Sequence, residues 1–371
     1  VEVSSMDDVE KFGPELHKLS FGEAIEKKLL TDYQVVIVGV DNELYSEMIS
    51  ERSLIQTHNK IESDAQSFAS HVGLAKAIGN YDLRRVITFH SRVKAANEFQ
   101  KDFLDVVDWM PSKSRPSGSF VTNYVSGAMT TSDRNQNLRR LGELEKGERA
   151  ILANARCLSE GVDVPALDGV AFIDPRNSEI DIVQAVGRAI RLSSAKDIGT
   201  IIIPVFIKEY EDPDEVLNES VFKKVWAVVN ALRSHDEGLG IELDNLRKAL
   251  GKRGSVGKSV KIHFDLPAQI SVAFEKALSV RLIESTTGSW EFWFGLLERY
   301  KDEQGHCLVP ARAHYFGMKL GSWVTVQRGK RDKLNKEQVA RLDGLGFSWD
   351  PFADQWEEGF SALQAYKEEH G

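Results

Sequence analysis

The chain has 371 residues, of which 42% are hydrophobic and 28% are charged, so it can bury the cores of two or three domains. Its formal net charge of −9 excludes a surface that is basic throughout, and any surface for nucleic acid must therefore be local. Two distant cysteines, Cys157 and Cys307, and short apolar runs argue against a disulfide framework, a zinc site and a membrane span, and favour a cytoplasmic protein.

Buried β-branched runs alternate with helical patterns up to about residue 210, after a lead-in of one short helix and loops at 1–34. Such alternation is typical of a mostly parallel sheet with helices on both faces. The sequence therefore predicts one α/β domain over 35–210. Its predicted strands are 34–40, 85–90, 120–125, 150–154, 169–173 and 200–207, and its predicted helices are 60–78, 93–109, 130–144 and 179–191.

No further strand is expected after residue 210. The spacing of apolar residues from Leu217 to Leu232 predicts helix, so 211–285 is interpreted as a helical connector. A basic loop is expected within it, because six basic residues and no acid occur between 247 and 261. Part of this loop, 251–259 (GKRGSVGKS), nearly spells a phosphate-binding loop. We reject that interpretation because Lys252 replaces the first glycine and no strand precedes the segment.

The last part of the chain contains an internal repeat. Residues 290–305 (WEFWFGLLERYKDEQG) and 356–371 (WEEGFSALQAYKEEHG) share Trp, Glu, Phe, Leu, Tyr, Lys, Glu and Gly at equal offsets. Trp290, Phe294, Leu297 and Tyr300 fall on one helix face. We expect an all-α region in which 286–352 is one small helical repeat and 353–371 is the truncated start of a second.

The segment 150–191 carries the motifs that are most informative about chemistry. It contains G-x-D-x-P, formed by Gly161, Asp163 and Pro165, and Q-x-x-G-R-x-x-R, formed by Gln184, Gly187, Arg188 and Arg191. In this order they resemble motifs V and VI of the superfamily 2 DEAD/DEAH-type helicases. Upstream, the segment with Ser91 resembles motif IV, and the turn at Gly127 resembles the conserved turn between these motifs.

This resemblance implies that 35–210 is a second RecA-like domain and that 1–34 is the junction from a missing first motor domain. It implies an ATP-dependent helicase or translocase, in which Arg188, Arg191 and Gln184 would act on the γ-phosphate. Cationic groups there neutralise charge that spreads over the phosphate oxygens during phosphoryl transfer. Gly161, Asp163 and Gly187 would couple the nucleotide to nucleic acid. Ser91, Gly127 and Asn154 would contact the nucleic-acid backbone.

The same resemblance implies ATP and Mg²⁺ as cofactors of the intact protein. Because the sequence holds neither a P-loop nor an acidic box, this chain alone is expected to be inactive and to bind neither tightly. No metal site is expected. The expected partners are the absent N-terminal lobe and nucleic acid, with DNA favoured over RNA, and no membrane.

The C-terminal repeat resembles the helicase-associated domain of bacterial proteins of this kind. Residues 306–347 carry eight basic and three acidic residues, with Tyr315, Phe316 and Trp323 among them. Basic groups interleaved with aromatic ones suit contact with a nucleic-acid backbone and stacking on bases. The candidate contact residues are Arg312, Lys319, Arg328, Lys330 and Arg331.

Other interpretations stay open at this point. The arginines of 184–191 could form a solvated helix face, and the basic repeat could cover an aromatic core or dock a protein. The chain could also be a binding module for nucleic acid or protein, without turnover of its own. A non-motor α/β enzyme, such as a glycosyl- or methyltransferase, is disfavoured because the segment 38–42 offers only one glycine for a cofactor loop.

Overall fold

The computed structural model describes residues 13, 19–41, 65–155, 167–174, 178–193, 196–207, 216–217, 220–268, 270 and 272–371. They belong to two compact units, one comprising 1–242 and 258–286 and the other 243–257 and 287–371. The predicted connector 211–285 is therefore not a separate body, because its residues are shared between the two units. Within the described residues, every helix is too short or too polar to cross a bilayer.

The first unit is built on a seven-stranded sheet in the order β3-β4-β2-β5-β6-β1-β7, and every pairing between its strands is parallel. This confirms the predicted RecA-like parallel sheet. The strands are β1 (Asp32–Asp41), β2 (Arg85–His90), β3 (Ser119–Ser126), β4 (Glu148–Ala155), β5 (Gly169–Asp174), β6 (Ile198–Ile207) and β7 (Ile262–Asp265).

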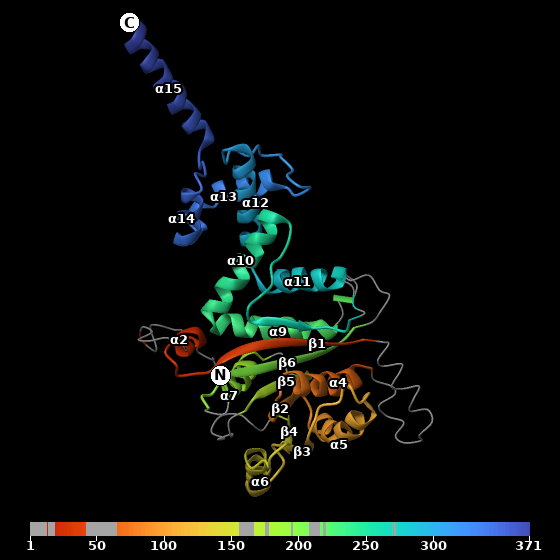
Figure 1. The fold of residues 1–371 in the computed structure, drawn as a ribbon. Coiled ribbons are helices and arrows are strands. Elements are labelled where there is room, and N and C mark those ends of the chain that lie inside the picture. The colour runs from red at the N-terminus through yellow and green to blue at the C-terminus, as the bar shows by residue number, and fades with distance from the viewer. Residues whose placement is uncertain are drawn as a thin grey trace. The chain divides into compact units, whose positions relative to one another are not determined.

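Helices cover both faces of this sheet. In Figure 1, α4 (Ala65–Asn80) and α5 (Val93–Trp109) lie below the sheet and α9 (Ser220–His235) lies above it. Alternate residues of β1, among them Val36 and Val38, join the core with α4 and α5, and the residues between them are buried as well. A strand buried on both faces has no polar side to display, which explains its continuous β-branched run.

The remaining helices of the first unit are α2 (Phe21–Glu26), α6 (Thr131–Gly142), α7 (Glu179–Ala189) and α11 (Val272–Thr286). α7 packs against α9, and α11 also contacts α9. The bounds predicted for the strand at 85–90 and the helix at 93–109 are confirmed, and those of the other predicted strands agree to within a few residues.

Two predictions after residue 210 are wrong. The short strand β7 pairs with Val35–Val38 of β1, although no further strand was expected. Only four residues long and partly exposed, β7 shows no pattern of its own, and β1 fixes its position. The predicted basic loop is also shorter than expected, because Arg247–Arg253 form the end of α10 (Glu237–Arg253).

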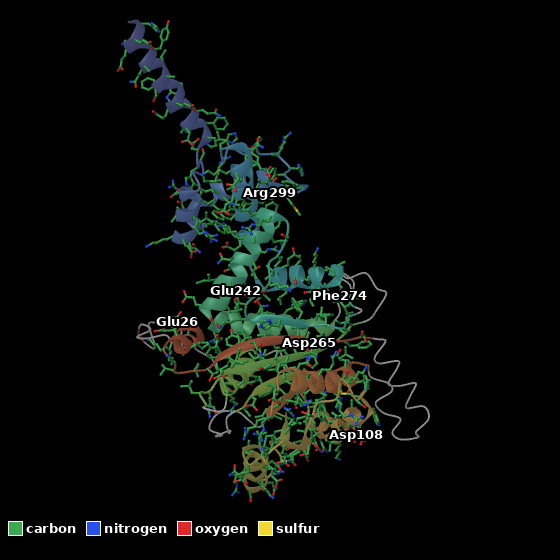
Figure 2. All side chains as sticks on the ribbon, viewed as in Figure 1. Glu26, Asp108, Glu242, Asp265, Phe274 and Arg299 are labelled. Carbon is green, nitrogen blue, oxygen red and sulfur yellow. The ribbon has the colours of Figure 1, made fainter. Side chains whose placement is uncertain are left out.

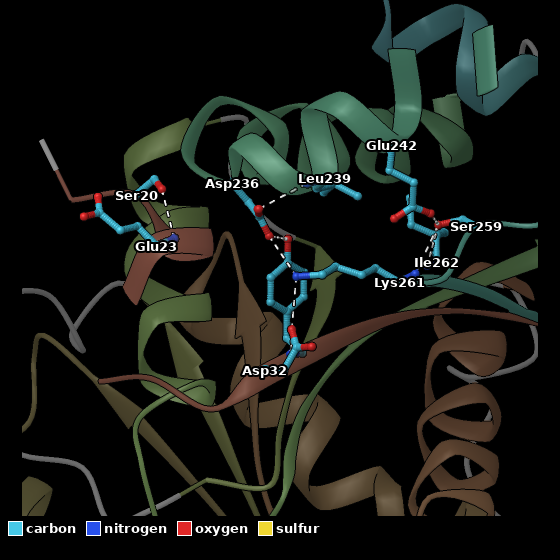
Figure 3. Close-up of polar contacts among 10 residues, drawn as sticks. Ser20, Glu23, Asp32, Asp236, Leu239, Glu242, Ser259, Lys261 and Ile262 are labelled. Carbon is cyan, nitrogen blue, oxygen red and sulfur yellow. Dashed lines mark hydrogen bonds and ion pairs between the residues drawn. The ribbon is translucent and has the colours of Figure 1, made fainter. Parts of the chain in front are cut away.

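A buried polar cluster holds α10 to β1 and to the segment before β7 (Figure 3). Asp236 is fully buried and caps α10 by accepting a hydrogen bond from the Leu239 backbone nitrogen at 3.1 Å. Its Oδ2 also accepts from the Tyr33 hydroxyl at 2.7 Å and from Lys261 Nζ at 3.0 Å. Lys261 Nζ in addition pairs with Asp32 at 3.0 Å and lies 4.3 Å from the centre of the Tyr33 ring. We call Asp32, Tyr33, Asp236 and Lys261 the Asp236 cluster.

The second unit contains the end of α10 and the helices α12 (Ser289–Gln304), α13 (Leu320–Gly329), α14 (Lys336–Gly344) and α15 (Pro351–His370), with a 3₁₀ turn η2 (Arg331–Lys333). Leucine and valine residues such as Leu297, Leu320 and Val324 form its core, and tryptophans surround them. α10 and α12 cross with their backbones in contact, because a Cβ added at Gly251 would lie 2.0 Å from the Phe292 carbonyl oxygen. One added at Gly295 would lie 2.0 Å from the Lys248 carbonyl oxygen.

Both copies of the internal repeat form helices, α12 and α15. In α12, the repeated positions Phe294 and Leu297 are buried in the core of the unit. In α15 no residue is buried, and Trp356 is 72% exposed. The second copy therefore forms the helix that its sequence predicts, while the face that corresponds to the buried face of α12 remains exposed.

Candidate functional site

The arginine helix α7 begins just beyond the carboxyl end of β5. The Ser178 hydroxyl caps it by accepting a hydrogen bond from the Asp181 backbone nitrogen at 3.3 Å. Ile182, Ala185, Val186 and Ala189 are buried, and Gln184 and Gly187 are half-buried. α7 therefore packs with one apolar stripe and keeps its motif residues along the border of that stripe.

Arg188 lies near the end of α7 and is only 7% exposed. Burial, together with the positive charge of nearby Arg191, lowers the pKa of the Arg188 guanidinium. Both causes disfavour the charged form of the side chain. Two close cations, one of them buried, make an arrangement that an incoming anion would stabilise.

The prediction that Arg191 lies on the same helix as Arg188 is wrong. α7 ends at Ala189, and Arg191 forms an isolated antiparallel bridge with Leu30. The neighbouring Thr31 backbone nitrogen donates to the Ile190 carbonyl oxygen at 2.8 Å, and the Thr31 hydroxyl donates to the Arg191 carbonyl oxygen at 3.3 Å. These bonds capture the end of the helix and hold Arg191, which is exposed, beside the segment that enters β1.

The residues predicted for motif V, Gly161 and Asp163 with Pro165, lie outside the described residues. Gln184, Gly187, Arg188 and Arg191 are described, so motif VI carries the structural argument. The described candidate residues form two groups, of which motif VI is the first. Its helix α7 begins after the carboxyl end of β5 and ends beside the segment before β1.

Ser91, Gly127 and Asn154 belong to the other group, which lies at the carboxyl edge of the sheet. Ser91 directly follows β2, Gly127 directly follows β3, and Asn154 is near the end of β4. These three strands are neighbours in the sheet, and Asn154 is in register with Phe89 of β2 and Val125 of β3. Gly127 is exposed and Asn154 is buried. The structure thus gathers residues that are far apart in the sequence at one edge.

Two further residues at this edge were missed from the sequence. Asp174 ends β5, next to β2, and accepts a hydrogen bond from the Ser91 hydroxyl. Lys224 of α9 donates to the Ile173 carbonyl oxygen at 3.1 Å. Burial lowers the pKa of Lys224 to about 7, although the charge of Asp174 opposes this shift. An acid at the end of a predicted strand was a usable signal for Asp174, whereas nothing in the sequence connects Lys224 to it.

The structure supports the rejection of 251–259 as a phosphate-binding loop. A P-loop connects a strand to a following helix. Here α10 precedes the segment and β7 follows it, so the order is reversed. Ser259, which would bind the metal of a P-loop, instead donates to Glu242 at 2.6 Å and accepts from the Ile262 backbone nitrogen at 2.9 Å. Among the described residues, no group of His, Cys, Asp and Glu side chains is arranged to hold a metal ion.

The predicted nucleic-acid contact residues of the second unit differ in their exposure and in their contacts within the unit. Arg312, Lys319 and Lys330 are exposed. Arg331 is also exposed, but its guanidinium lies 4.9 Å from the centre of the Trp349 ring. Arg328 is half-buried and donates to the Ser348 carbonyl oxygen at 2.9 Å. The structure therefore favours a packing role for Arg328.

The aromatic candidates divide in the same way. Trp323 packs against Trp290 and Trp293 in the aromatic border of the core. Tyr315 is half-buried, whereas Phe316 is 58% exposed at the tip of a turn. Of the three aromatic residues proposed for stacking, Phe316 therefore offers the most open ring.

Comparison with known proteins identifies two domains in the chain. Residues 73–193 match the helicase conserved C-terminal domain, and residues 287–350 match the helicase associated domain. The first match includes Ser91, Gly127, Asn154 and all four residues of motif VI. The second includes the exposed cations and Phe316.

Curated relatives include proteins named as probable helicases. The probable helicase A859L of African swine fever virus is 25% identical over 271 residues, which cover 70% of this chain and 28% of that protein. UvrABC system protein B of Clostridium botulinum is 26% identical over 183 residues, which cover 43% of this chain and 27% of that protein. The chain thus spans less than a third of the length of the curated relatives it matches.

Among solved structures, the ATP-dependent Type ISP restriction-modification enzyme LlaBIII bound to DNA has a similar fold. The TM-score is 0.64 at 23% sequence identity, and the match covers 95% of this chain and 26% of that one. This likeness supports the fold alone. The chain therefore carries a region that matches the helicase conserved C-terminal domain, on a RecA-like parallel sheet, followed by a region that matches the helicase associated domain.

Proposed function

We propose that this chain is the C-terminal part of an ATP-dependent nucleic-acid helicase or translocase. In this proposal a second, P-loop-bearing lobe binds ATP and Mg²⁺, and this chain supplies Arg188 and Arg191 to the triphosphate. The observation that carries it is the placement of the buried Arg188 beside Arg191, at the captured end of α7. Burial and the charge of Arg191 both lower the pKa of Arg188, and an anionic ligand would favour its charged form.

A phosphate group nearby would favour the charged form of both arginines. Arginine presents a planar fork of donors that matches phosphate oxygens, and it stays charged at neutral pH. As the γ-phosphate leaves, negative charge spreads over its oxygens, and nearby guanidinium groups stabilise that state more than the ground state. Gln184, half-buried one turn before Arg188, would hold the guanidinium or the phosphate in position. No residue of this chain is assigned to Mg²⁺.

The nucleic acid would contact the chain at other surfaces. Ser91, Gly127, Asn154 and the missed residue Asp174 lie at the carboxyl edge of four neighbouring strands, where the exposed backbone at Gly127 and the hydroxyl of Ser91 suit a sugar–phosphate backbone. The exposed cations Arg312, Lys319 and Lys330 of the second unit add a local positive charge. The separation of this edge from the end of α7 allows the nucleotide and the nucleic acid to occupy different surfaces.

The test is ATP hydrolysis by the full-length protein that includes the P-loop lobe. We expect Arg188→Ala and Arg191→Ala each to lower turnover strongly, by roughly a thousand-fold for a residue that acts as an arginine finger. Arg139→Ala is the matched control, because Arg139 is an exposed arginine of α6 on the same unit. Circular dichroism should show that both variants remain folded. Unchanged turnover in a folded Arg188→Ala protein would contradict the assignment.

The same proposal predicts the ATPase activity of the 371-residue chain alone. It should not hydrolyse ATP, because its sequence contains no P-loop. Measurable turnover that persists through purification and disappears in Arg188→Ala would show that this chain holds a complete nucleotide site, which the proposal excludes.

A further inference from the structure

Phe316 occupies a backbone conformation that a bulky side chain rarely adopts. Its φ is 49°, and that of Gly317 is 75°, so two successive residues are left-handed. Tyr315 and Met318 exchange backbone hydrogen bonds of 2.8 and 3.0 Å around them. This is the two-residue hairpin turn for which Asn-Gly is the preferred sequence. A phenylalanine at the first position strains the backbone, and such strain calls for a functional explanation.

The ring of Phe316 is held from one side by an ordered set of contacts. The Arg299 guanidinium of α12 lies 3.5 Å from the ring centre (Figure 2 labels Arg299). Arg299 Nε donates to Glu303 Oε1 at 3.0 Å, and the Tyr315 hydroxyl donates to the other oxygen of the same carboxylate. Glu303 thus fixes both the arginine under the ring and the tyrosine that begins the turn.

This arrangement leaves the ring prepared for a second stacking partner. Despite the contacts with Arg299 and Tyr315, Phe316 remains 58% exposed, and the neighbouring Met318 is 44% exposed. One exposed ring is ordinary on a protein surface, so it is the left-handed backbone together with the ordered contact of Arg299 that points to a role.

Cations border the turn on both sides. Arg312 and Lys319 are exposed. Lys319 lies in the loop 313–321, which is closed by a hydrogen bond of 3.1 Å from the Gly321 backbone nitrogen to the Ala313 carbonyl oxygen, and Arg312 immediately precedes this loop. Both therefore lie within four residues of Phe316 along the chain. An exposed ring between positive charges matches a ligand that offers a flat π-surface with negative charge on both sides, which describes an unpaired base and its flanking phosphates.

We propose that Phe316 is a stacking platform for an unpaired base of single-stranded nucleic acid. Arg299 supports the ring from behind, and Arg312 and Lys319 contact the phosphates on either side of that base. This inference rests on the proposed function, because it assigns a particular contact to the nucleic-acid surface of the second unit.

The test uses the 371-residue chain and a single-stranded oligonucleotide that contains 2-aminopurine, whose fluorescence reports stacking. We expect Phe316→Asn to weaken binding by roughly five-fold to a hundred-fold. It should abolish the stacking signal and leave the dependence of affinity on salt unchanged. It should not lower the unfolding midpoint, because Asn-Gly suits the turn better than Phe-Gly. Phe352→Asn is the control, since Phe352 is an exposed phenylalanine of α15.

The double variant Arg312→Ser/Lys319→Ser distinguishes the stacking role of Phe316 from the general nucleic-acid role of the second unit. It should reduce the slope of log affinity against log salt by about 1.4, as expected for two lost phosphate contacts on a single strand. If that slope falls while Phe316→Asn binds like the wild type, the stacking platform is overturned and the nucleic-acid role of the unit stands. If the wild-type chain does not bind the oligonucleotide, or the double variant binds with an unchanged slope, the nucleic-acid role fails as well.

Discussion

The two units of the chain use their charged residues differently. The sheet unit has a core of aliphatic side chains, such as Val36, and buried phenylalanines, such as Phe103, and its notable charges lie where strands and helices end. The second unit has a core bordered by aromatic rings, and its arginines cover those rings. Arg341, for example, makes a bidentate ion pair with Glu291 at 2.7 and 2.9 Å and lies 4.5 Å from the centre of the Phe294 ring.

This difference shows how to interpret a buried arginine in such a chain. The hydrogen bonds and charge of Glu291 raise the pKa of Arg341, although burial opposes the shift. The pKa of Arg188 is lowered, because burial and Arg191 both act against its charge. A half-buried arginine whose charge the fold stabilises is part of the packing. A lowered pKa does not by itself indicate a ligand, because burial also lowers the pKa of Arg328, which packs against the Ser348 carbonyl oxygen. The Asp236 cluster provides the first way to test this rule, since there a buried charge belongs to the sheet unit and is nevertheless stabilised.

Asp236→Ala is expected to have the largest effect on stability. It removes the cap of α10, the acceptor of the Tyr33 hydroxyl and one of the two carboxylates that pair with Lys261. Breaking a buried pair in this way costs about 3–5 kcal/mol, and we expect the lower end, because Asp32 remains within 3.0 Å of Lys261 Nζ.

The loss of unfolding free energy is measured by urea unfolding of the 371-residue chain. Hydrogen exchange of the β1 and β6 amides reports the unfolding of the sheet unit. Asp105→Ala is the matched control, because Asp105 is an exposed aspartate of α5. A loss no greater than that of the control would mean that the Asp236 cluster contributes little, and the distinction between stabilised and disfavoured charges would lose its main support.

Gly295→Ala tests the second unit and should have a smaller effect. The added methyl group would lie 2.0 Å from the Lys248 carbonyl oxygen, so α10 and α12 must move apart. Overpacking of this kind costs about 1–3 kcal/mol. Gly344→Ala is the control, because a Cβ at this helical glycine meets open space and should stabilise α14 by about 0.5–1 kcal/mol. Near-ultraviolet circular dichroism of the tryptophans follows the unfolding of this unit. Equal effects of both substitutions would contradict the close crossing.

Much of the fold could be predicted from the sequence, because long buried strands and amphipathic helices carry their own periodicity. The strand 85–90 and the helix 93–109 are the clearest examples. What could not be predicted depends on partners distant in the sequence. β7 is defined by β1, and the break between α9 and α10 is stabilised by Tyr33 and Lys261. α7 ends at Ala189, and the two residues that follow it bind Leu30 and Thr31.

In the candidate site, too, some features follow from the local sequence and others depend on residues that are distant in the sequence. Motif spacing predicts Gln184 and Arg188 as site residues, and the order of strands brings the predicted residues Ser91, Gly127 and Asn154 to one edge. Sequence could not separate Arg328, which packs, from Arg312, which is exposed, because both are arginines in the same basic stretch. Their difference arises from which ring or carbonyl group the folded chain places beside each one.

The smallest expected effect concerns pH and Asp236. Burial alone would raise the pKa of this carboxyl group, but the hydrogen bonds from Tyr33, Lys261 and the Leu239 backbone nitrogen outweigh it and lower the pKa. A lowered pKa in the folded state means that the unfolded chain binds the proton more readily. Asp236 therefore stabilises the sheet unit fully above the ordinary aspartate pKa of about 3.9, and this contribution is lost as the pH falls below that value.

Comparison of the wild type with Asp236→Asn isolates this contribution. The free energy of unfolding should decline less steeply in the variant between about pH 5 and about pH 3, because asparagine does not titrate there. Asp105→Asn should follow the wild type. If Asp236→Asn and the wild type decline in parallel, the carboxylate is not preferentially charged in the folded state. The Asp236 cluster would then be held by neutral hydrogen bonds, and the contrast with Arg188 would rest on burial alone.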